Sequence, residues 1–374
     1  MDFLNSFSIY LPIAEMQFNV ILLLVIGFCV GVLGGFFGVG GGWIVTPALN
    51  LYGFPMDYAI GTDITHIFGK SIVATKIHSG LGNVDWKLGF YSIACSVVGV
   101  EAGAQIIMYF KDIFGSEGLD VIVRWSYVAL LLILGSLMLV DYFYVSTKPE
   151  KAAKLEAKKY KSHPEKEKII LHKTKKEKES FPHRLQKMRI PPMISFPTSG
   201  IKEVSFWVVF TVFFIAGVLQ GFLGVGGGFI KMPAMIYLLG TPTVIAVGTD
   251  LFNVLVTSIY GGFTYAMKGR VELIAALIMC VGGAFGAVFG STATKYVRGY
   301  GIRLLFAIMI LLAGGSIIIK QFEKPLDIPF LNALSGYLVV GSSIVMTLLV
   351  LGKLLTSYLK RKALEKSFDP AQFE

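Results

Sequence analysis

The chain has 374 residues, of which 54% are hydrophobic and 16% are charged. A soluble protein covers its surface with charged residues that make up about a quarter of the chain, so this composition excludes an ordinary soluble globular protein. The formal net charge is +10, but 16 of the 34 Lys and Arg residues and only 7 of the 24 Asp and Glu residues lie within residues 148–203. The rest of the chain is close to neutral, so we expect no nucleic-acid partner.

Apolar stretches near the length that crosses a bilayer, about 20 residues, recur along the chain. They cover approximately residues 20–36, 58–80, 88–110, 121–145, 204–222, 243–266, 271–294, 303–319 and 331–358. We therefore predict an all-α, polytopic integral membrane protein in the cell (inner) membrane. The segment before the first stretch has no Lys or Arg, so we expect no cleavable signal peptide. The three cysteines lie inside apolar stretches, and we expect them to pack, with no metal and no cofactor.

Two motifs occur twice. "GFFGVGGGWIVTPAL", which begins at Gly35, is echoed by "GFLGVGGGFIKMPAM", which begins at Gly221. "AIGTDI" at 59–64 is echoed by "AVGTDL" at 246–251. We predict a first membrane repeat at 1–145, a linker at 146–203, and a second repeat with an extra C-terminal helix at 204–374.

The linker is rich in Lys and Arg, and basic loops lie on the cytoplasmic side of a membrane. It is either a solvated, partly disordered connection or a polybasic patch on anionic lipid headgroups.

The positive-inside rule also predicts the relation between the repeats. If residues 20–36 and 43–53 form a re-entrant hairpin that enters and leaves on one face, each half crosses the membrane about three more times. An odd number of crossings makes the repeats inverted. Fixing the linker in the cytoplasm then places "KYVRGYGIR" (295–303) and "LKRKALEK" (359–366) there too, as the rule requires. We expect two inverted-topology repeats, with the linker and the C-terminus cytoplasmic.

Each glycine motif precedes a short apolar run. The run at 43–53 would reach only about 16 Å as a helix, half of a bilayer, and the run at 229–240 is similar. Such a helix begins near the midplane with unpaired N–H groups, which favour an anion. Alternatively, the glycines only permit close helix packing, which we expect for the Gly-x-x-x-Gly pairs at 99–103 and 286–290. The expected substrate-binding residues are Gly38, Gly40, Gly41, Gly42, Thr46, Gly224, Gly226, Gly227, Gly228 and Lys231.

Ionisable residues within apolar segments are costly and are functional candidates. A Thr-Asp pair occurs near the start of a helix in each half, where it would either cap the helix or bind or relay a proton. Asp63, His66 and Lys70 are spaced to share one helix face, which we expect to avoid lipid. Glu101 lies in mid-segment, as a proton-exchanging group or as a neutral structural one. The candidates for a proton-coupling or polar pathway are Thr62, Asp63, His66, Lys70, Glu101, Thr249, Asp250 and Asn253.

At these motifs the chain resembles the TauE/SafE-type sulfite exporter family, also called the 4-toluene sulfonate uptake permeases. The repeated glycine motif, the "AIGTDI" and "AVGTDL" segments, "GNVDW" and the Gly-x-x-x-Gly pairs carry the resemblance, which covers both membrane halves but not residues 146–203. The resemblance implies export or uptake of sulfite, a sulfonate or a related small anion, coupled to protons.

We therefore expect a secondary transporter, an exporter of a small sulfur-containing or organic anion, with membrane lipids and protons as its other partners. The alternatives are an anion channel and an uptake permease for an organic anion. An intramembrane enzyme ranks last, because neither HExxH nor GxSxG occurs in the apolar segments.

Overall fold

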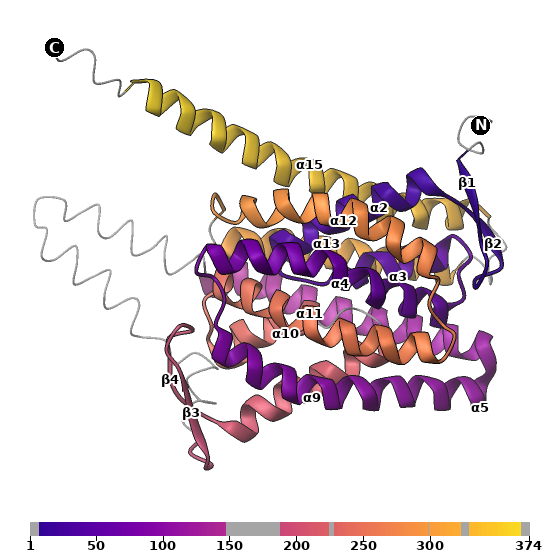
Figure 1. Ribbon diagram of the computed structural model, residues 1–374, viewed down its shortest axis with the longest axis horizontal. Coiled ribbons are helices and arrows are strands. Elements are labelled where there is room, and N and C mark those ends of the chain that lie inside the picture. Colours follow the sequence, from indigo (N-terminus) through magenta and orange to yellow (C-terminus); the bar gives the residue numbers. More distant parts are fainter. Residues whose placement is uncertain (1–6, 147–187, 224–227, 298, 323–328, 368–374) are drawn as a thin grey trace, which may run out of the picture.

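The structure is a computed structural model that describes residues 7–146, 188–223, 228–297, 299–322 and 329–367. It is built almost entirely of helices that run roughly parallel or antiparallel to one another (Figure 1). In chain order the elements are β1 (Ser8–Leu11), β2 (Met16–Asn19), α2 (Val20–Phe37), α3 (Gly42–Leu51), α4 (Met56–Gly80), α5 (Trp86–Val140), η1 (Asp141–Ser146), β3 (Met193–Phe196), β4 (Ile201–Ser205), α9 (Phe206–Leu223), α10 (Gly228–Ala234), η2 (Met235–Leu239), α11 (Thr243–Met267), α12 (Leu273–Ala293), α13 (Gly299–Gln321) and α15 (Pro329–Ser367).

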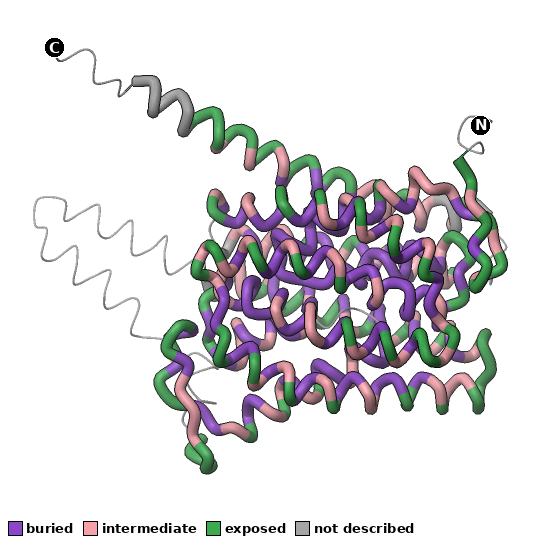
Figure 2. The backbone as a smooth tube through the Cα atoms, in the orientation of Figure 1, coloured by how far each residue is buried: buried purple, intermediate pink, exposed green. Residues whose placement is uncertain are grey.

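Seven helices in the described ranges are long and apolar enough to cross a membrane: Val20–Phe37, Trp86–Phe143, Phe206–Leu223, Thr243–Met267, Leu273–Ala293, Gly301–Gln321 and Leu334–Lys360. The expected span at 58–80 forms α4, which is not among the seven. Large apolar side chains such as Phe90, Phe263 and Phe285 face outward, whereas charged side chains such as Lys70 and Lys231 are buried. The buried backbone lies in the middle of the bundle (Figure 2). This pattern suits a lipid environment and confirms the prediction of an all-α, polytopic membrane protein.

The apolar stretch at 88–110 and most of that at 121–145 belong to the single element α5, and the end of the second stretch lies in η1. Helix α5 contains one non-helical residue, Gly115, with φ 68° and ψ −178°. This backbone conformation is open to glycine and strained for other residues. At Gly115 the chain can reverse direction without an intervening loop.

The closest helix pairs join one half of the chain to the other. In α12, a Cβ atom added to Gly286 or Gly290 would overlap a backbone carbonyl oxygen of α2. In α5, a Cβ added to Gly99 or Gly103 would overlap a carbonyl oxygen of α9. Both Gly-x-x-x-Gly pairs therefore permit backbone-to-backbone contact between helices, and the prediction of a packing role is confirmed.

A β-hairpin precedes the first helix of each half. Strands β1 and β2 pair antiparallel before α2, and strands β3 and β4 pair antiparallel before α9. The two hairpins lie at opposite ends of the bundle (Figure 1). Each hairpin turn is held by a carboxylate from the other half. Glu272 accepts from the N–H groups of Ile13 (2.8 Å) and Ala14 (3.0 Å), and Asp85 accepts from the N–H (3.0 Å) and hydroxyl (2.6 Å) of Ser199.

The repeated threonines form a second pair of reciprocal contacts. The Thr62 hydroxyl accepts from the backbone N–H of Glu272 at 2.9 Å, and the Thr249 hydroxyl accepts from that of Asp85 at 2.9 Å. The alternative in which the two Thr-Asp pairs cap their own helices is wrong, since α4 begins at Met56 and α11 at Thr243, well before the pair in each case. Each threonine instead satisfies a free N–H group at the start of a helix of the other half.

Candidate functional site

The first glycine motif connects α2 to the ten-residue helix α3 inside the bundle. Gly38 ends α2 with φ 78°, and Gly41 precedes α3 with φ 88°. Both values favour glycine, which explains why the turn is made of this residue. All residues from 38 to 42 are buried. Because these residues are buried, α3, which is about 15 Å long, begins inside the protein.

The second motif leads into α10, which continues as η2, so that residues 228–239 form a short apolar helical segment. The expected site residues Gly224, Gly226 and Gly227 lie outside the described residues. Gly228 is buried and contacts the first motif, since a Cβ added to it would lie 2.9 Å from the Cα of Val39 and 3.1 Å from the carbonyl oxygen of Gly38. The first motif and the start of α10 therefore meet in the interior.

A polar cluster of the first half lies beside this junction. Thr46 of α3 donates its hydroxyl hydrogen to Asp63 of α4 at 2.8 Å. The other carboxylate oxygen of Asp63 lies 3.1 Å from Nδ1 of His66. All three side chains are fully buried, as expected for a helix face that avoids lipid.

Lys70 lies on the same face of α4 and is 2% exposed. A Cβ added to Gly41 would lie 2.6 Å from its Nζ, so the ammonium group rests against the residue that precedes α3. Within the described ranges, neither Lys70 Nζ nor His66 Nε2 has a hydrogen-bond partner. A buried ammonium without acceptors is costly, and next to a helix N-terminus it forms a strongly electropositive position.

The second half holds a different polar network around Lys231, which is also fully buried. Its ammonium donates to Gln220 at 2.8 Å and to Oδ1 of Asn253. Gln220 donates to Thr257 at 3.0 Å, and Asn253 donates to Ser92 of α5 at 2.6 Å. Lys231 therefore has neutral acceptors, whereas Lys70 has none in the described part of the chain.

The two lysines occupy different positions in the repeat. When the glycine motifs are aligned, Lys231 corresponds to Val45, which immediately precedes Thr46. When "AIGTDI" is aligned with "AVGTDL", Lys70 corresponds to Thr257. Each half nevertheless buries one lysine near its glycine motif.

Asp250 is the equivalent of Asp63, but its surroundings differ. It is fully buried, and neither carboxylate oxygen has a hydrogen-bond partner among the described residues. A Cβ added to Gly228 would contact its Oδ2. Asp250 therefore lies against the start of α10, at the junction with the first glycine motif.

Glu101 lies apart from these clusters. It is partly exposed on α5 and accepts from Gln105 at 2.5 Å and from the hydroxyl of Tyr260 at 2.9 Å. Its oxygens are satisfied by neighbours on the outer surface, which favours the structural alternative for this residue.

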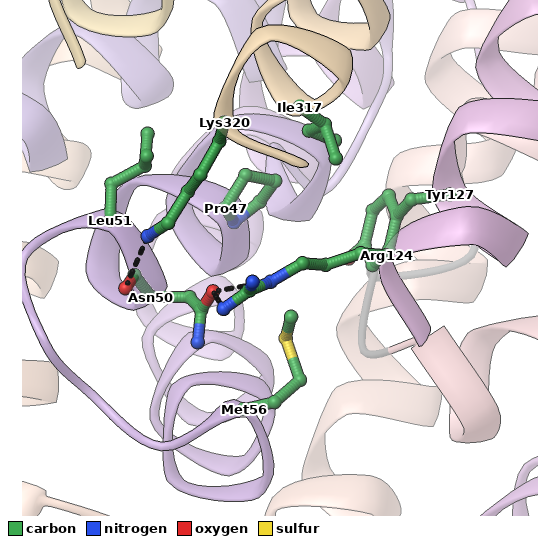
Figure 3. A pocket seen from close by; sticks show the side chains of 8 residues that line it. All are labelled: Pro47, Asn50, Leu51, Met56, Arg124, Tyr127, Ile317 and Lys320. Atoms are coloured by element: carbon green, nitrogen blue, oxygen red, sulfur yellow. Dashed lines mark hydrogen bonds between the residues drawn. The ribbon is translucent and has the colours of Figure 1, made fainter. Parts of the chain in front are cut away.

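A small cavity of about 20 Å³ lies at the other end of α3 (Figure 3). Arg124 donates to the side chain of Asn50 at 3.1 and 2.8 Å, and Lys320 donates to its backbone carbonyl at 3.1 Å. Cations at a helix C-terminus complement its exposed carbonyl groups. This cluster therefore stabilises α3 in its buried position.

An open cleft of about 520 Å³ lies where α4, α11 and α12 reach one end of the bundle. It is lined by Leu81, Asn83, Val244, Thr294, Lys295, Tyr296 and Val297. Nδ2 of Asn83, which lines the cleft, lies 3.4 Å from Nδ1 of His78. Nε2 of His78 in turn lies 3.0 Å from the carbonyl oxygen of Gly35. A chain of polar groups thus connects the cleft to the first glycine motif.

Two residues of the site were not among the sequence candidates. Gln220 and Ser92 hold Lys231 and Asn253 in place. Gln220 is a lone amide in an otherwise apolar run, and this signal could have identified it. Ser92 offered none, because serine is common in membrane helices at packing positions. Among the described residues no group of three His, Cys, Asp or Glu side chains could hold a metal ion.

Comparisons with known proteins agree with this picture. The chain is 25% identical to the probable membrane transporter protein YunE of Bacillus subtilis over 306 residues, which cover 80% of this chain and 97% of that protein. It is 21% identical to the probable membrane transporter protein YjnA of the same organism, over 78% of this chain and 97% of that protein. A probable membrane transporter protein of Methanocaldococcus jannaschii is 27% identical over 36% of this chain and 50% of its own length. No solved structure matches the chain.

A sequence profile of the sulfite exporter TauE/SafE family matches residues 23–317, which include both glycine motifs and every buried lysine and aspartate described above. The chain is a multi-pass membrane protein that belongs to the sulfite exporter TauE/SafE family.

Proposed function

We propose that the protein is a secondary transporter that exports a small anion, such as sulfite, a sulfonate or a related organic anion, from the cytoplasm, coupled to protons. The anion binds where the first glycine motif meets the start of α3. The observation that carries the proposal is Lys70, a buried ammonium group without a hydrogen-bond partner in the described chain, placed against Gly41.

The site has the components that an anion requires. The first N–H groups of a helix lack partners within the helix, and the partial positive charge of this helix end favours a negative group. Lys70 adds a full charge, and His66 Nε2 offers a further polar atom that no described residue satisfies. Thr46 is engaged by Asp63, so we assign it to positioning the carboxylate.

The proposal includes two inverted-topology repeats with re-entrant hairpins formed by α2–α3 and α9–α10. It is supported by the hairpins β1–β2 and β3–β4 at opposite ends of the bundle and by the reciprocal contacts of Thr62 and Thr249. Transporters built from inverted repeats place their substrate at the junction of broken helices near the midplane. The linker, the C-terminus and the open cleft then lie on the cytoplasmic side, and the chain is in the inner membrane.

Anion binding by purified protein tests the proposal. Calorimetric titration with sulfite, sulfate and ethanesulfonate identifies the ligand. A unit charge about 4 Å away contributes up to about 4 kcal/mol at an effective dielectric constant of about 20, so Lys70→Met should weaken binding at least about tenfold, or 1.4 kcal/mol. Lys70→Arg should retain part of the affinity because it keeps the charge.

Two further lysines serve as controls. Lys76 is exposed on the same helix, so Lys76→Met should bind as the wild type does. Lys231→Met should weaken binding less than Lys70→Met, because the Lys231 ammonium already has two acceptors. Equal affinity of Lys70→Met and the wild type would contradict the proposed site.

A further inference from the structure

The two halves differ in which buried charged side chain has a hydrogen-bond partner. In the first half the aspartate, Asp63, is hydrogen-bonded, and the lysine, Lys70, has no partner in the described ranges. In the second half the lysine, Lys231, is hydrogen-bonded, and the aspartate, Asp250, has no partner among the described residues. The repeats have therefore diverged into one position that lacks an anion and one that lacks a proton or a cation.

These two positions are close together. Lys70 rests against Gly41, and Asp250 rests against Gly228, which in turn contacts Gly38. Lys70 thus lies against one end of the loop from 38 to 41, and Asp250 lies against Gly228, which contacts the other end of that loop. A charge that enters beside Lys70 therefore acts on Asp250 through the protein interior, where screening by water is weak.

The charged and titratable groups around Asp250 come from a few elements. Helix α2 contributes no charged side chain, and Asp85 of α5 is held by Ser199. Arg303 of α13 is paired with Asp141. On α4, Asp57 is paired with Lys111 and Arg270, and His78 is hydrogen-bonded to the carbonyl oxygen of Gly35. The Tyr127 hydroxyl of α5 donates to the carbonyl oxygen of Leu223. Further buried ionisable groups on the elements packed against α11 are Lys231 of α10 and Asp63, His66 and Lys70 of α4.

We infer that Asp250 is the group that takes up one proton when a monovalent anion binds beside Lys70. This inference rests on the proposed function and names its coupling residue. When Lys70, Lys231, Asp63 and Asp250 are all ionised, the four side chains together carry no net charge. An added monovalent anion leaves one uncompensated negative charge in the interior, which is costly. A proton from water that binds an oxygen of the Asp250 carboxylate restores neutrality, and it is released when the anion leaves.

A cation such as sodium is a poorer occupant of this position. Sodium would require several oxygen ligands, and in the described part of the chain no group of three His, Cys, Asp or Glu side chains could hold a metal ion. A proton needs only the one carboxylate.

The test is proton uptake during binding. Ethanesulfonate is the probe, because its own charge does not change across the neutral pH range. In weakly buffered solution the wild type should take up one proton for each anion bound, and its affinity should fall by up to about tenfold per unit rise in pH. Asp250→Asn mimics the protonated acid, so it should bind the anion without proton uptake and with an affinity that does not depend on pH. Asp250→Glu should restore proton uptake.

Two controls separate Asp250 from its neighbours. His66→Gln tests the neighbouring titratable group of the anion site: if it binds the anion without proton uptake while Asp250→Asn keeps proton uptake, the assignment to Asp250 is overturned. An infrared pH titration of the protein without anion should show a carboxylic-acid band that is absent from Asp250→Asn and present in Asp63→Asn.

The outcomes also separate this inference from the proposed function. Binding of ethanesulfonate by the wild type without proton uptake would refute the role of Asp250 and leave the anion site intact. Absence of all binding would count against the proposed function, and the infrared band would then decide alone whether Asp250 exchanges a proton.

Discussion

The contact between α2 and α12 predicts that a single methyl group destabilises the protein. In Gly290→Ala, the new Cβ would overlap the carbonyl oxygen of Val32 and lie 2.9 Å from its Cα. Both are backbone atoms of a helix, so the overlap is relieved only if the two helices separate. Overpacking of this kind costs about 1–3 kcal/mol, and the better helix propensity of alanine offsets about 1 kcal/mol at most.

A matched substitution gives the opposite sign. Gly315 lies in α13, and a Cβ added to it has no atom within 4 Å. Gly315→Ala should therefore leave stability unchanged or raise it by about 0.5–1 kcal/mol. The assay is the apparent melting temperature of the purified protein in detergent, followed by size-exclusion chromatography after heating. If Gly290→Ala melts at or above the wild-type temperature, as Gly315→Ala should, the α2–α12 contact is not as close as described.

Three further predictions concern the interior and the topology. Thr249→Val removes the acceptor of the buried Asp85 N–H and should cost about 1–3 kcal/mol of stability, whereas Thr292→Val on an exposed face of α12 should not lower the melting temperature measurably. Gly41→Ala places an alanine at a φ of 88° and directs its Cβ toward Lys70, so we expect calorimetry on folded protein to detect no anion binding. Unchanged affinity would refute the arrangement of the loop. Cysteines introduced at the exposed positions Tyr10 and Lys202, in the two hairpins, should react with an impermeant thiol reagent from opposite faces of the membrane, and reaction from one face would remove the inverted topology.

Much of the fold could be predicted from hydrophobicity and repetition. The apolar runs correspond to helices because a bilayer requires long apolar segments. Aligning "AIGTDI" with "AVGTDL" pairs Thr62 with Thr249 from the sequence alone. The sequence could not predict what these threonines bind, because their partners, the N–H groups of Glu272 and Asp85, lie in the other half.

The sequence could predict which residues form the site but not which hydrogen bonds they make. Burial of Asp63, His66 and Lys70 follows from their spacing on one helix. Whether a buried lysine has acceptors depends on contacts between helices that are distant in sequence, such as that of Lys231 with Gln220 and Asn253. Lys231 is the one charged residue among the substrate-binding residues expected from the sequence, whereas our proposal places Lys70 beside the anion.

The most direct test of the central claim is anion flux in proteoliposomes that contain the purified protein. The account predicts uptake of labelled sulfite or ethanesulfonate that saturates with concentration and is accelerated by unlabelled anion on the opposite side. It also predicts that uptake is lost in Lys70→Met and retained in Lys76→Met. Flux that does not saturate and shows no exchange would indicate a channel, and undiminished flux in Lys70→Met would contradict the proposed site.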